Sequence, residues 1–302
     1  MKASTLRSDV LLLLTATIWG FAFVAQRMGM DDVGPFTYNG VRFALGCLSL
    51  APLLRGSRHA PLGTALPPAG RRLFLVGGGV LGIVLFIAAS LQQVALLYTT
   101  AGKAGFITGL YVVIVPLCGL FWGRRPGGGM VIGALLAAAG LYFLSVTESI
   151  AMEFGDGLVL VSAFFWAAQV LLVAWLSPRL NPVRLAIYQF AVCSLLSLAA
   201  AFCFEAVSWS GIRAAALPIL YGGILSVGVA YTLQVVAQRD AHPAHASILM
   251  SLEAVFAALG GWLLLDERMN LRGFLGCGLM LTGMVVSQVW GLKLRRSRCG
   301  GS

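Results

Sequence analysis

Three ionisable side chains, Glu253, Arg42 and Lys103, stand within or at the edge of long apolar runs of the sequence. If those runs cross a bilayer, a charge at the centre costs at least ~2.5–3.5 kcal/mol on insertion scales, which makes such residues the first candidates for function. Glu253, deep in its run, is predicted to be a proton site or a ligand for a substrate ammonium group, with a buried strut as the alternative. Arg42 and Lys103 are assigned gating or electrostatic roles, with a structural pair and snorkelling to the interface as the alternatives.

Uncharged polar and aromatic side chains form a second group within the same runs. Amide and phenol groups orient a polar ligand while rings supply apolar contact, so these residues are predicted to line a substrate-binding site with Glu253. An interfacial aromatic belt is the alternative for some of them, but Trp19 and Trp166 lie too deep in their runs for a belt. The group comprises Trp19, Asn39, Gln92, Tyr98, Tyr111, Trp166, Gln169, Tyr188, Gln189 and Gln234.

No catalytic motif accompanies these candidates. The histidines His59, His242 and His245 lack the further ligands that a metal site needs. The cysteines form no CxxC pair, and most of them fall in apolar runs, where we expect small buried hydrophobes. A nucleophile elbow, paired intramembrane aspartates and a phosphate-binding loop are also missing from the sequence. We therefore expect no enzyme, no metal, no cofactor and no ATP-driven mechanism.

The composition indicates a membrane protein. Of 302 residues, 59% are hydrophobic and only 11% are charged, whereas soluble domains carry about 25% charged residues. The net charge of +10 could suggest nucleic acid, but the basic residues sit in short gaps between apolar runs and form no nucleic-acid motif. We interpret them as topology signals, and we expect the lipid bilayer as a partner.

Ten apolar runs are each close to the ~20 residues that a transmembrane helix needs. Lipid offers no hydrogen bonds to the backbone, so we expect helices. With the N-terminus in the cytoplasm, 15 Lys and Arg fall inside against 5 outside, which predicts N-in and C-in topology in the inner (plasma) membrane. The first run is long for a signal peptide and is kept as a span. The predicted spans are 9–27, 36–54, 72–96, 101–122, 129–147, 156–176, 183–204, 214–237, 244–265 and 271–292.

An internal repeat relates the two halves of the chain. A shift of 147 residues places the first span on the sixth, and later spans match after a small gap. Two units of five spans, 1–147 and 148–295, are therefore predicted, followed by a basic tail at 296–302. Because five is odd, the second unit enters the membrane from the opposite face, as in many secondary transporters. Matched pairs include Asp9/Asp156, Trp19/Trp166, Pro35/Pro182, Phe43/Phe190, Gln92/Gln234, Gly133/Gly276 and Gly140/Gly283.

The matched pairs also predict how the site is built. Trp19 with Trp166, and Gln92 with Gln234, should face each other across the pseudo-symmetry axis. Small residues at four-residue spacing, such as Gly78 with Gly82, predict close helix packing that is either static or able to slide. Pro116 removes a backbone hydrogen bond within its run and predicts a kink, as a gating point or as shape alone.

Three segments carry a family resemblance: ATIWGFAFVAQR (16–27), TTAGKAGFITGLYVVIVPLCGLFWGRR (99–125) and HASILMSLEAVFAALGGWLLLDERMNLRGFLGCGLMLTGMVV (245–286). The chain resembles the EamA family of the drug/metabolite transporter superfamily, from about residue 9 to 292. It departs from the family at Ala254, where a proline is usual, and at Arg124, where an acid would match Glu267. The resemblance implies an all-α membrane protein of ten helices, in two inverted five-helix repeats around a central cavity.

The resemblance also implies a transporter that exports amino acids or other metabolites. A site with glutamines, aromatic rings and one acidic residue deep in the membrane fits a neutral or aromatic amino acid. A polyphosphate would require several basic residues within the membrane. We expect alternating access through a midplane cavity, with proton coupling left open. The alternatives are a facilitator of other metabolites, such as a nucleobase, a sugar or a drug-like molecule, and less favoured are a channel or a membrane-embedded enzyme.

Overall fold

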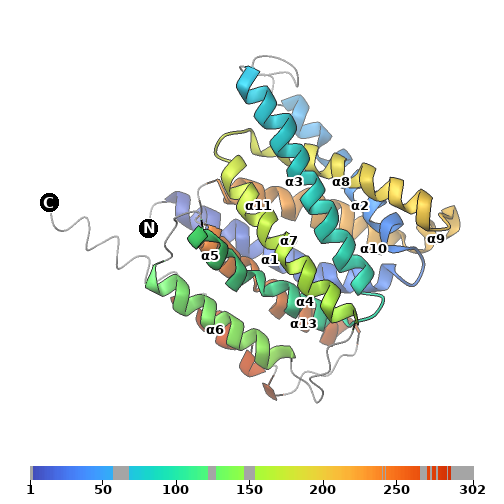
Figure 1. Cartoon of the computed structure of the whole chain (residues 1–302). Helices are drawn as coiled ribbons and strands as arrows, with labels where there is room; N and C mark the ends of the chain where they lie inside the picture. Colours follow the sequence, from blue (N-terminus) through green and yellow to red (C-terminus); the bar gives the residue numbers. More distant parts are fainter. Residues whose placement is uncertain are drawn as a thin grey trace.

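The computed structural model describes residues 3–56, 68–121, 127–145, 154–239, 241 and 243–265, and those between 271 and 286 except 273, 277 and 284. These residues are helical with short connections, and none of them forms a strand. The helices of the first half are α1 (Ala3–Gly29), α2 (Pro35–Gly56), α3 (Pro68–Ala95), α4 (Ala101–Gly109), α5 (Tyr111–Phe121) and α6 (Gly128–Ser145) (Figure 1). Those of the second half are α7 (Phe154–Leu176), α8 (Pro182–Phe204), α9 (Trp209–Ala214), α10 (Ala216–Leu220), the π-helix η1 (Tyr221–Tyr231), α11 (Thr232–Ala237), α12 (Pro243–Met250) and α13 (Glu253–Leu264). Further helical residues follow between 271 and 286.

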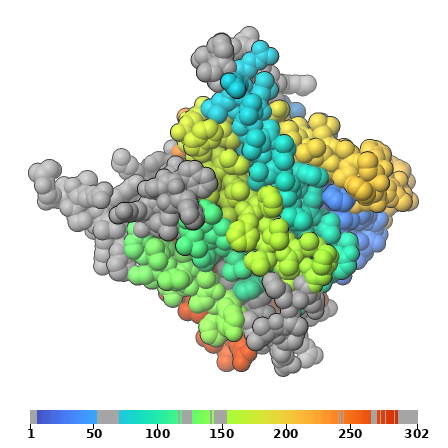
Figure 2. All heavy atoms as spheres, in the orientation of Figure 1, coloured from blue at the N-terminus to red at the C-terminus, as the bar shows by residue number. Residues whose placement is uncertain are grey.

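Six helical stretches of the described chain are long and apolar enough to cross a membrane: Leu6–Gly29, Gly70–Ala95, Phe154–Leu176, Pro182–Phe204, Ala216–Ala237 and His245–Leu264. Shorter apolar helices cover Ala101–Val115, Gly128–Gly140 and Phe274–Gly283. Large apolar side chains are exposed on the outside, Phe202 at 75% and Leu217 at 74% among them. This surface suits lipid because extensive apolar exposure is unusual for a soluble monomer. In the space-filling view, α3 and α7 lie side by side across one face (Figure 2).

Three of the predicted spans are interrupted. The span 101–122 breaks at Leu110, between α4 and α5, and the span 244–265 breaks at Ser251 and Leu252, between α12 and α13. The span 214–237 is divided among α10, η1 and α11. At the first break, tight turns replace α-helical bonds: the Leu110 N–H donates to Ile107, and the Val113 N–H donates to Leu110. Helix α5 then continues through Pro116, so the interruption in this span lies at Leu110.

Helices α2 and α8 pack through contacts that match in pairs. The thiol of Cys47 donates to the carbonyl oxygen of Ile187 over 3.4 Å, and the hydroxyl of Ser194 donates to that of Gly40 over 2.9 Å. A shift of 147 residues carries Cys47 to Ser194 and Gly40 to Ile187. One hydrogen bond therefore becomes the other when the two halves are exchanged, as in a two-fold symmetric interface.

Exchanging the two halves also relates the contact between α1 and η1 to the contact between α7 and α3. Thr15 donates through its hydroxyl to the carbonyl oxygen of Ala230 over 3.2 Å, and Ser162 donates to that of Ala88 over 3.1 Å. Thr15 and Ser162 are 147 residues apart, and Ala88 and Ala230 are 142 apart. Each half thus ties its first long helix to the third span of the other half of the chain by an equivalent bond.

Glycines form a matched crossing between α6 and the helical segment after residue 271. A Cβ at Gly140 would meet the carbonyl oxygen of Gly276 at 2.5 Å, and one at Gly283 would meet that of Gly133 at 2.6 Å. The backbones approach so closely that only hydrogen fits, as in small-residue packing of membrane helices. These two contacts also exchange when the halves are exchanged.

Several features named from the sequence lie outside the described residues. They are the side chain of Pro116, the residues His59, His242, Arg124, Cys277 and Cys299, the Asp266–Glu267–Arg268 turn and the basic tail 296–302.

Candidate functional site

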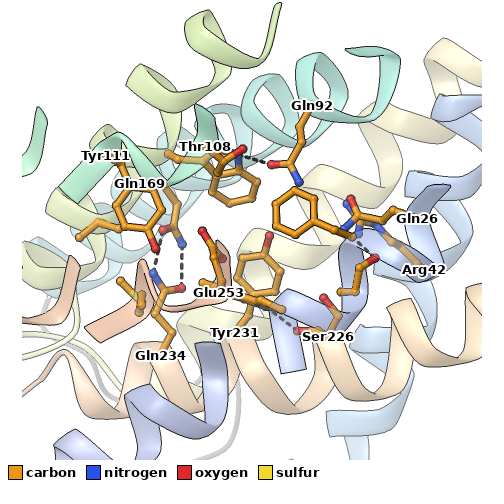
Figure 3. Close-up of a pocket in the computed structure, with 16 residues that line it drawn as sticks. Gln26, Arg42, Gln92, Thr108, Tyr111, Gln169, Ser226, Tyr231, Gln234 and Glu253 are labelled. Carbon is orange, nitrogen blue, oxygen red and sulfur yellow. Dashed lines mark hydrogen bonds between the residues drawn. The ribbon is translucent and has the colours of Figure 1, made fainter. Parts of the chain in front are cut away.

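A cavity of about 30 Å³ lies among the helices (Figure 3). Seven of the eleven predicted substrate-binding residues line it, together with Arg42. The full lining is Trp19, Ala22, Phe23, Gln26, Arg42, Gln92, Thr108, Tyr111, Trp166, Gln169, Val170, Ser226, Tyr231, Gln234, Met250 and Glu253. The pocket is therefore polar and aromatic, and residues from both halves of the chain line it.

The interrupted helices place two of these residues at equivalent positions. Tyr111 is the first residue of α5, and Glu253 is the first residue of α13. They are 142 residues apart, the same shift that matches Gln92 to Gln234. Both side chains are 3% exposed. Broken helices whose ends meet at a central site are a recurring feature of secondary transporters.

Tyr231 is the centre of an aromatic cluster. The centroid of its ring lies 4.5 Å from that of Trp19 and 6.0 Å from that of Trp166. The ring centroids of Phe43 on α2 and Phe190 on α8 lie 6.0 and 5.7 Å from the ring centroid of Tyr231. The two matched tryptophans therefore meet through Tyr231, at distances typical of favourable aromatic pairs.

Sequence reasoning missed Tyr231 because it relied on matched pairs. A shift of 142 residues from Tyr231 leads back to Ala89, which is too small to suggest an aromatic site. The pocket is thus asymmetric at this position, with a large ring in one half and a methyl group in the other. A ring deep in an apolar run was the only available signal.

Side-chain amides connect α3 and η1–α11 to α7. The indole N–H of Trp166 donates to Oε1 of Gln92 over 2.6 Å. The side-chain amides of Gln169 and Gln234 form two reciprocal hydrogen bonds, of 3.3 and 3.0 Å. Gln92 and Gln234 thus each bind a residue of α7. Such satisfied networks hold polar groups in fixed positions in a low-dielectric site.

Two ionisable side chains of opposite type line the same pocket. Arg42 is 2% exposed and Glu253 is 3% exposed. Within the described chain, Nε of Arg42 and Oε1 of Glu253 are buried without a hydrogen-bond partner. The Arg42 guanidinium lies 5.4 Å from the ring of Tyr38 and 5.0 Å from that of Phe43, which supports it by cation–π attraction. Figure 3 shows Arg42 and Glu253 on different sides of the pocket, with Glu253 beside Tyr231.

Four predicted site residues lie outside the pocket lining, and Gln189, which is fully buried on α8, is one of them. Asn39 is buried and donates through its amide to the carbonyl oxygen of Ala89 over 3.1 Å. Tyr98 is 53% exposed, and Tyr188 stacks on Phe74 with ring centroids 5.1 Å apart. Depth along a run does not reveal which helix face a side chain occupies, and Tyr98 lies in the turn after α3 and not on a helix.

Lys103 and the metal question complete the account of the predicted residues. Lys103 does not line the pocket; its Nζ lies 3.8 Å from Oδ2 of Asp156 at the start of α7. Among the residues that the structure describes, no group of three His, Cys, Asp or Glu side chains could hold a metal ion. The pocket therefore offers hydrogen bonds, rings and two charges.

Comparison with known proteins places the chain in a family. The model of the EamA-like transporter family matches residues 6–146 and again residues 153–288. A protein of Archaeoglobus fulgidus named an uncharacterized transporter is 32% identical over 93% of this chain and 85% of its own length. A probable amino-acid metabolite efflux pump of Escherichia coli is 25% identical, over 98% of this chain and 99% of its own length.

Two further similarities agree with this assignment. The uncharacterized inner membrane transporter YedA of Escherichia coli is 27% identical over 89% of this chain and 86% of its own length. A solved crystal structure aligns with a TM-score of 0.73 at 19% identity, over 95% of this chain and 98% of that one, which shows a shared fold. The chain therefore belongs to the EamA-like transporter family, and it is a multi-pass membrane transporter and not an enzyme.

Proposed function

We propose that this transporter exports neutral amino acids, aromatic ones included, by binding them as zwitterions in the central pocket. The observation that carries the proposal is the pair of buried ionisable side chains of opposite type, Arg42 and Glu253, which line one cavity and each have one polar atom without a hydrogen-bond partner. An unpaired charge in a low-dielectric interior is costly. A ligand with one carboxylate and one ammonium group would compensate both charges at once.

The remaining lining favours an amphipathic ligand. Trp19, Trp166 and Tyr231 present rings, whereas Gln26, Thr108 and Ser226 add polar groups. Amino-acid side chains without charge would contact the rings, and the polar groups would fix the orientation of the ligand. The name of the Escherichia coli relative, a probable amino-acid metabolite efflux pump, agrees with this substrate class and with export.

The proposed mechanism is alternating access by ten spans in two inverted five-helix repeats, with both termini in the cytoplasm. The paired hydrogen bonds of α2 with α8 support the two-fold relation, as does the double match of the family model. The distribution of basic residues supports the orientation. We place the protein in the inner membrane of the cell, as the name of the relative YedA states for that protein.

The test is flux in proteoliposomes loaded with a labelled neutral amino acid such as phenylalanine. We expect protein-dependent, saturable flux, which a channel would not give. The decarboxylated amine and the corresponding 2-hydroxy acid each lack one charge and should compete at least about tenfold less well, since a charged hydrogen bond contributes about 1.5–3 kcal/mol. Equal competition by all three compounds would refute the zwitterion proposal, and no flux of any amino acid would refute the substrate class.

Proton coupling is tested with the same vesicles. Flux is measured with and without a pH gradient for wild type and for Glu253→Gln, which keeps the shape of the side chain. If the gradient drives wild-type flux and the variant loses only that drive, Glu253 is the coupling site. If flux ignores the gradient in both proteins, the transporter is a facilitator and Glu253 serves binding or structure.

A further inference from the structure

Two partly buried pairs of ionisable side chains lie between helices outside the pocket, and the one that contains a histidine is an ion pair when that histidine is protonated. In the first, called here the His245 pair, Nε2 of His245 on α12 lies 2.9 Å from Oδ1 of Asp9 on α1. In the second, the Lys103 pair, Nζ of Lys103 on α4 lies 3.8 Å from Oδ2 of Asp156 on α7. Asp156 also accepts a 2.7 Å hydrogen bond from the hydroxyl of Thr99. Both aspartates are largely buried, at 12% and 8% exposure, so the pairs fasten helix to helix.

The two pairs lie at opposite ends of the pocket-forming helices. Gly105, close to Lys103 in α4, packs against Phe23. Phe23 follows Asp9 by 14 residues on α1, which corresponds to about 21 Å at 1.5 Å per residue. Trp19, which lines the pocket, lies between these levels. In Figure 1 the start of α1 lies on the left, beside the N-terminus, whereas α4 and the start of α7 lie at the lower right.

The positions of the two pairs exchange with the halves of the chain. Asp9 and Asp156 are 147 residues apart, and Lys103 and His245 are 142 apart. The same two shifts relate the hydrogen bonds of Thr15 and Ser162 described above. The same contact therefore occurs twice, once at each end of the pocket-forming helices. The partner of the aspartate is a lysine in one copy and a histidine in the other.

Each pair also joins one half of the chain to the other. Asp9 belongs to the first half and His245 to the second, while Lys103 belongs to the first and Asp156 to the second. The cavity between them, about 30 Å³, has room for only one or two water molecules. A metabolite can reach it only if helices separate at one end, and at either end an ion pair joins helices that belong to different halves.

We propose that the His245 pair and the Lys103 pair are the two alternating gates of the transporter, each holding one end closed while the other opens. The proposal rests on the alternating-access function given above. Asp9–His245 closes the cytoplasmic end in the proposed topology, and Lys103–Asp156 closes the outer end. The structure has both pairs formed and a cavity too small for substrate, which corresponds to an occluded state.

Distances between spin labels in the full-length protein, reconstituted in nanodiscs without substrate, test this proposal. With the native cysteines replaced, one label pair is placed at Leu6 and Ala241 for the end of the His245 pair. A second label pair is placed at Gly102 and Gly157 for the other end. The variants are Asp9→Asn and Asp156→Asn, which remove one charge at one end and keep the side-chain volume.

We expect Asp9→Asn to shift the Leu6–Ala241 distance distribution to longer values by several ångströms and to leave the other distribution unchanged. Asp156→Asn should do the reverse. The exchange Lys103→Asp with Asp156→Lys should restore the short distance that Asp156→Asn loses, and it serves as the test if the single variant does not fold. Unchanged distributions in both single variants, lengthening at both ends together, or no restoration by the exchange would each overturn the proposal.

The flux assay separates this proposal from the substrate assignment. If the distances respond as expected but no amino acid is transported, the gate proposal is supported and the proposed substrate class is refuted. If amino acids are transported but the distances are unchanged in both variants, the transport proposal is supported and the gate proposal is refuted.

Discussion

Gly20→Ala is the substitution whose consequence follows most directly from the geometry. Gly20 lies on α1 beside Trp19, where α1 crosses the start of α13. A Cβ at this position would lie 2.7 Å from the carbonyl oxygen of Glu253 and 2.8 Å from the backbone nitrogen of Ala257, and closer still to Phe256. Two of these atoms belong to the backbone, so a change of rotamer cannot relieve the clash.

The expected cost follows from these distances. Non-bonded heavy atoms are comfortable at about 3.5–4.0 Å, so α1 and α13 must separate by roughly 1 Å. Overpacking of this kind costs about 1–3 kcal/mol, and the better helix propensity of alanine offsets at most about 1 kcal/mol. We expect a net loss of about 1–2 kcal/mol. Because the first residue of α13 is Glu253, the shift should also reduce transport.

Thermal unfolding in detergent, at one scan rate for all proteins, measures the stability change. Flux in proteoliposomes measures the effect on transport. The matched control is Gly157→Ala on α7, where an added Cβ meets nothing within 4 Å. The control should unfold at the wild-type temperature or slightly above it. A Gly20→Ala protein that equals this control in both assays would refute the reasoning about the crossing.

Four further substitutions test the pocket. Trp166→Phe removes the indole donor and leaves Oε1 of Gln92 unsatisfied, so the variant should lose about 1–3 kcal/mol of stability in thermal unfolding; an unchanged midpoint would contradict the importance of the bond. Gln169→Leu and Gln234→Leu should each destabilise by a similar amount, and the double variant should cost less than the sum in a double-mutant cycle; strict additivity would show that the amides do not interact. Arg42→Lys keeps the charge but loses the planar group between two rings, so flux should require a higher substrate concentration, and an unchanged KM would exclude Arg42 from binding.

The sequence grouped several residues that line the central cavity, but it did not predict where the helices break. Trp19 and Trp166 were found because the repeat marks equivalent positions, and a polar site between inverted halves depends on such positions. Asn39 and Tyr188 were chosen by depth alone and lie on other helix faces. Tyr231 was overlooked because its counterpart is an alanine. Depth and repeats are readable from one sequence, whereas the rotation of each helix about its axis depends on packing.

Helix interruptions were also difficult to predict. The kink at Pro116 stays a prediction, whereas the break at Leu110 was not predicted. The equivalent break at Leu252 falls in a stretch, from Ile248 to Val255, without proline or glycine. Backbone groups there are arranged by tertiary contacts around the pocket, which local propensity does not encode.

The low apolarity of α2 has a consequence for how the protein is made. This helix is long enough to span a bilayer but is not among the six that are apolar enough, because it carries Asn39 and Arg42. Its tightest neighbours, at Gly40 and Gly46, are Leu198 of α8 and Val227 of η1. Both neighbours leave the ribosome well over a hundred residues after α2. The contacts that pack α2 at Gly40 and Gly46 can therefore form only after most of the chain has been translated.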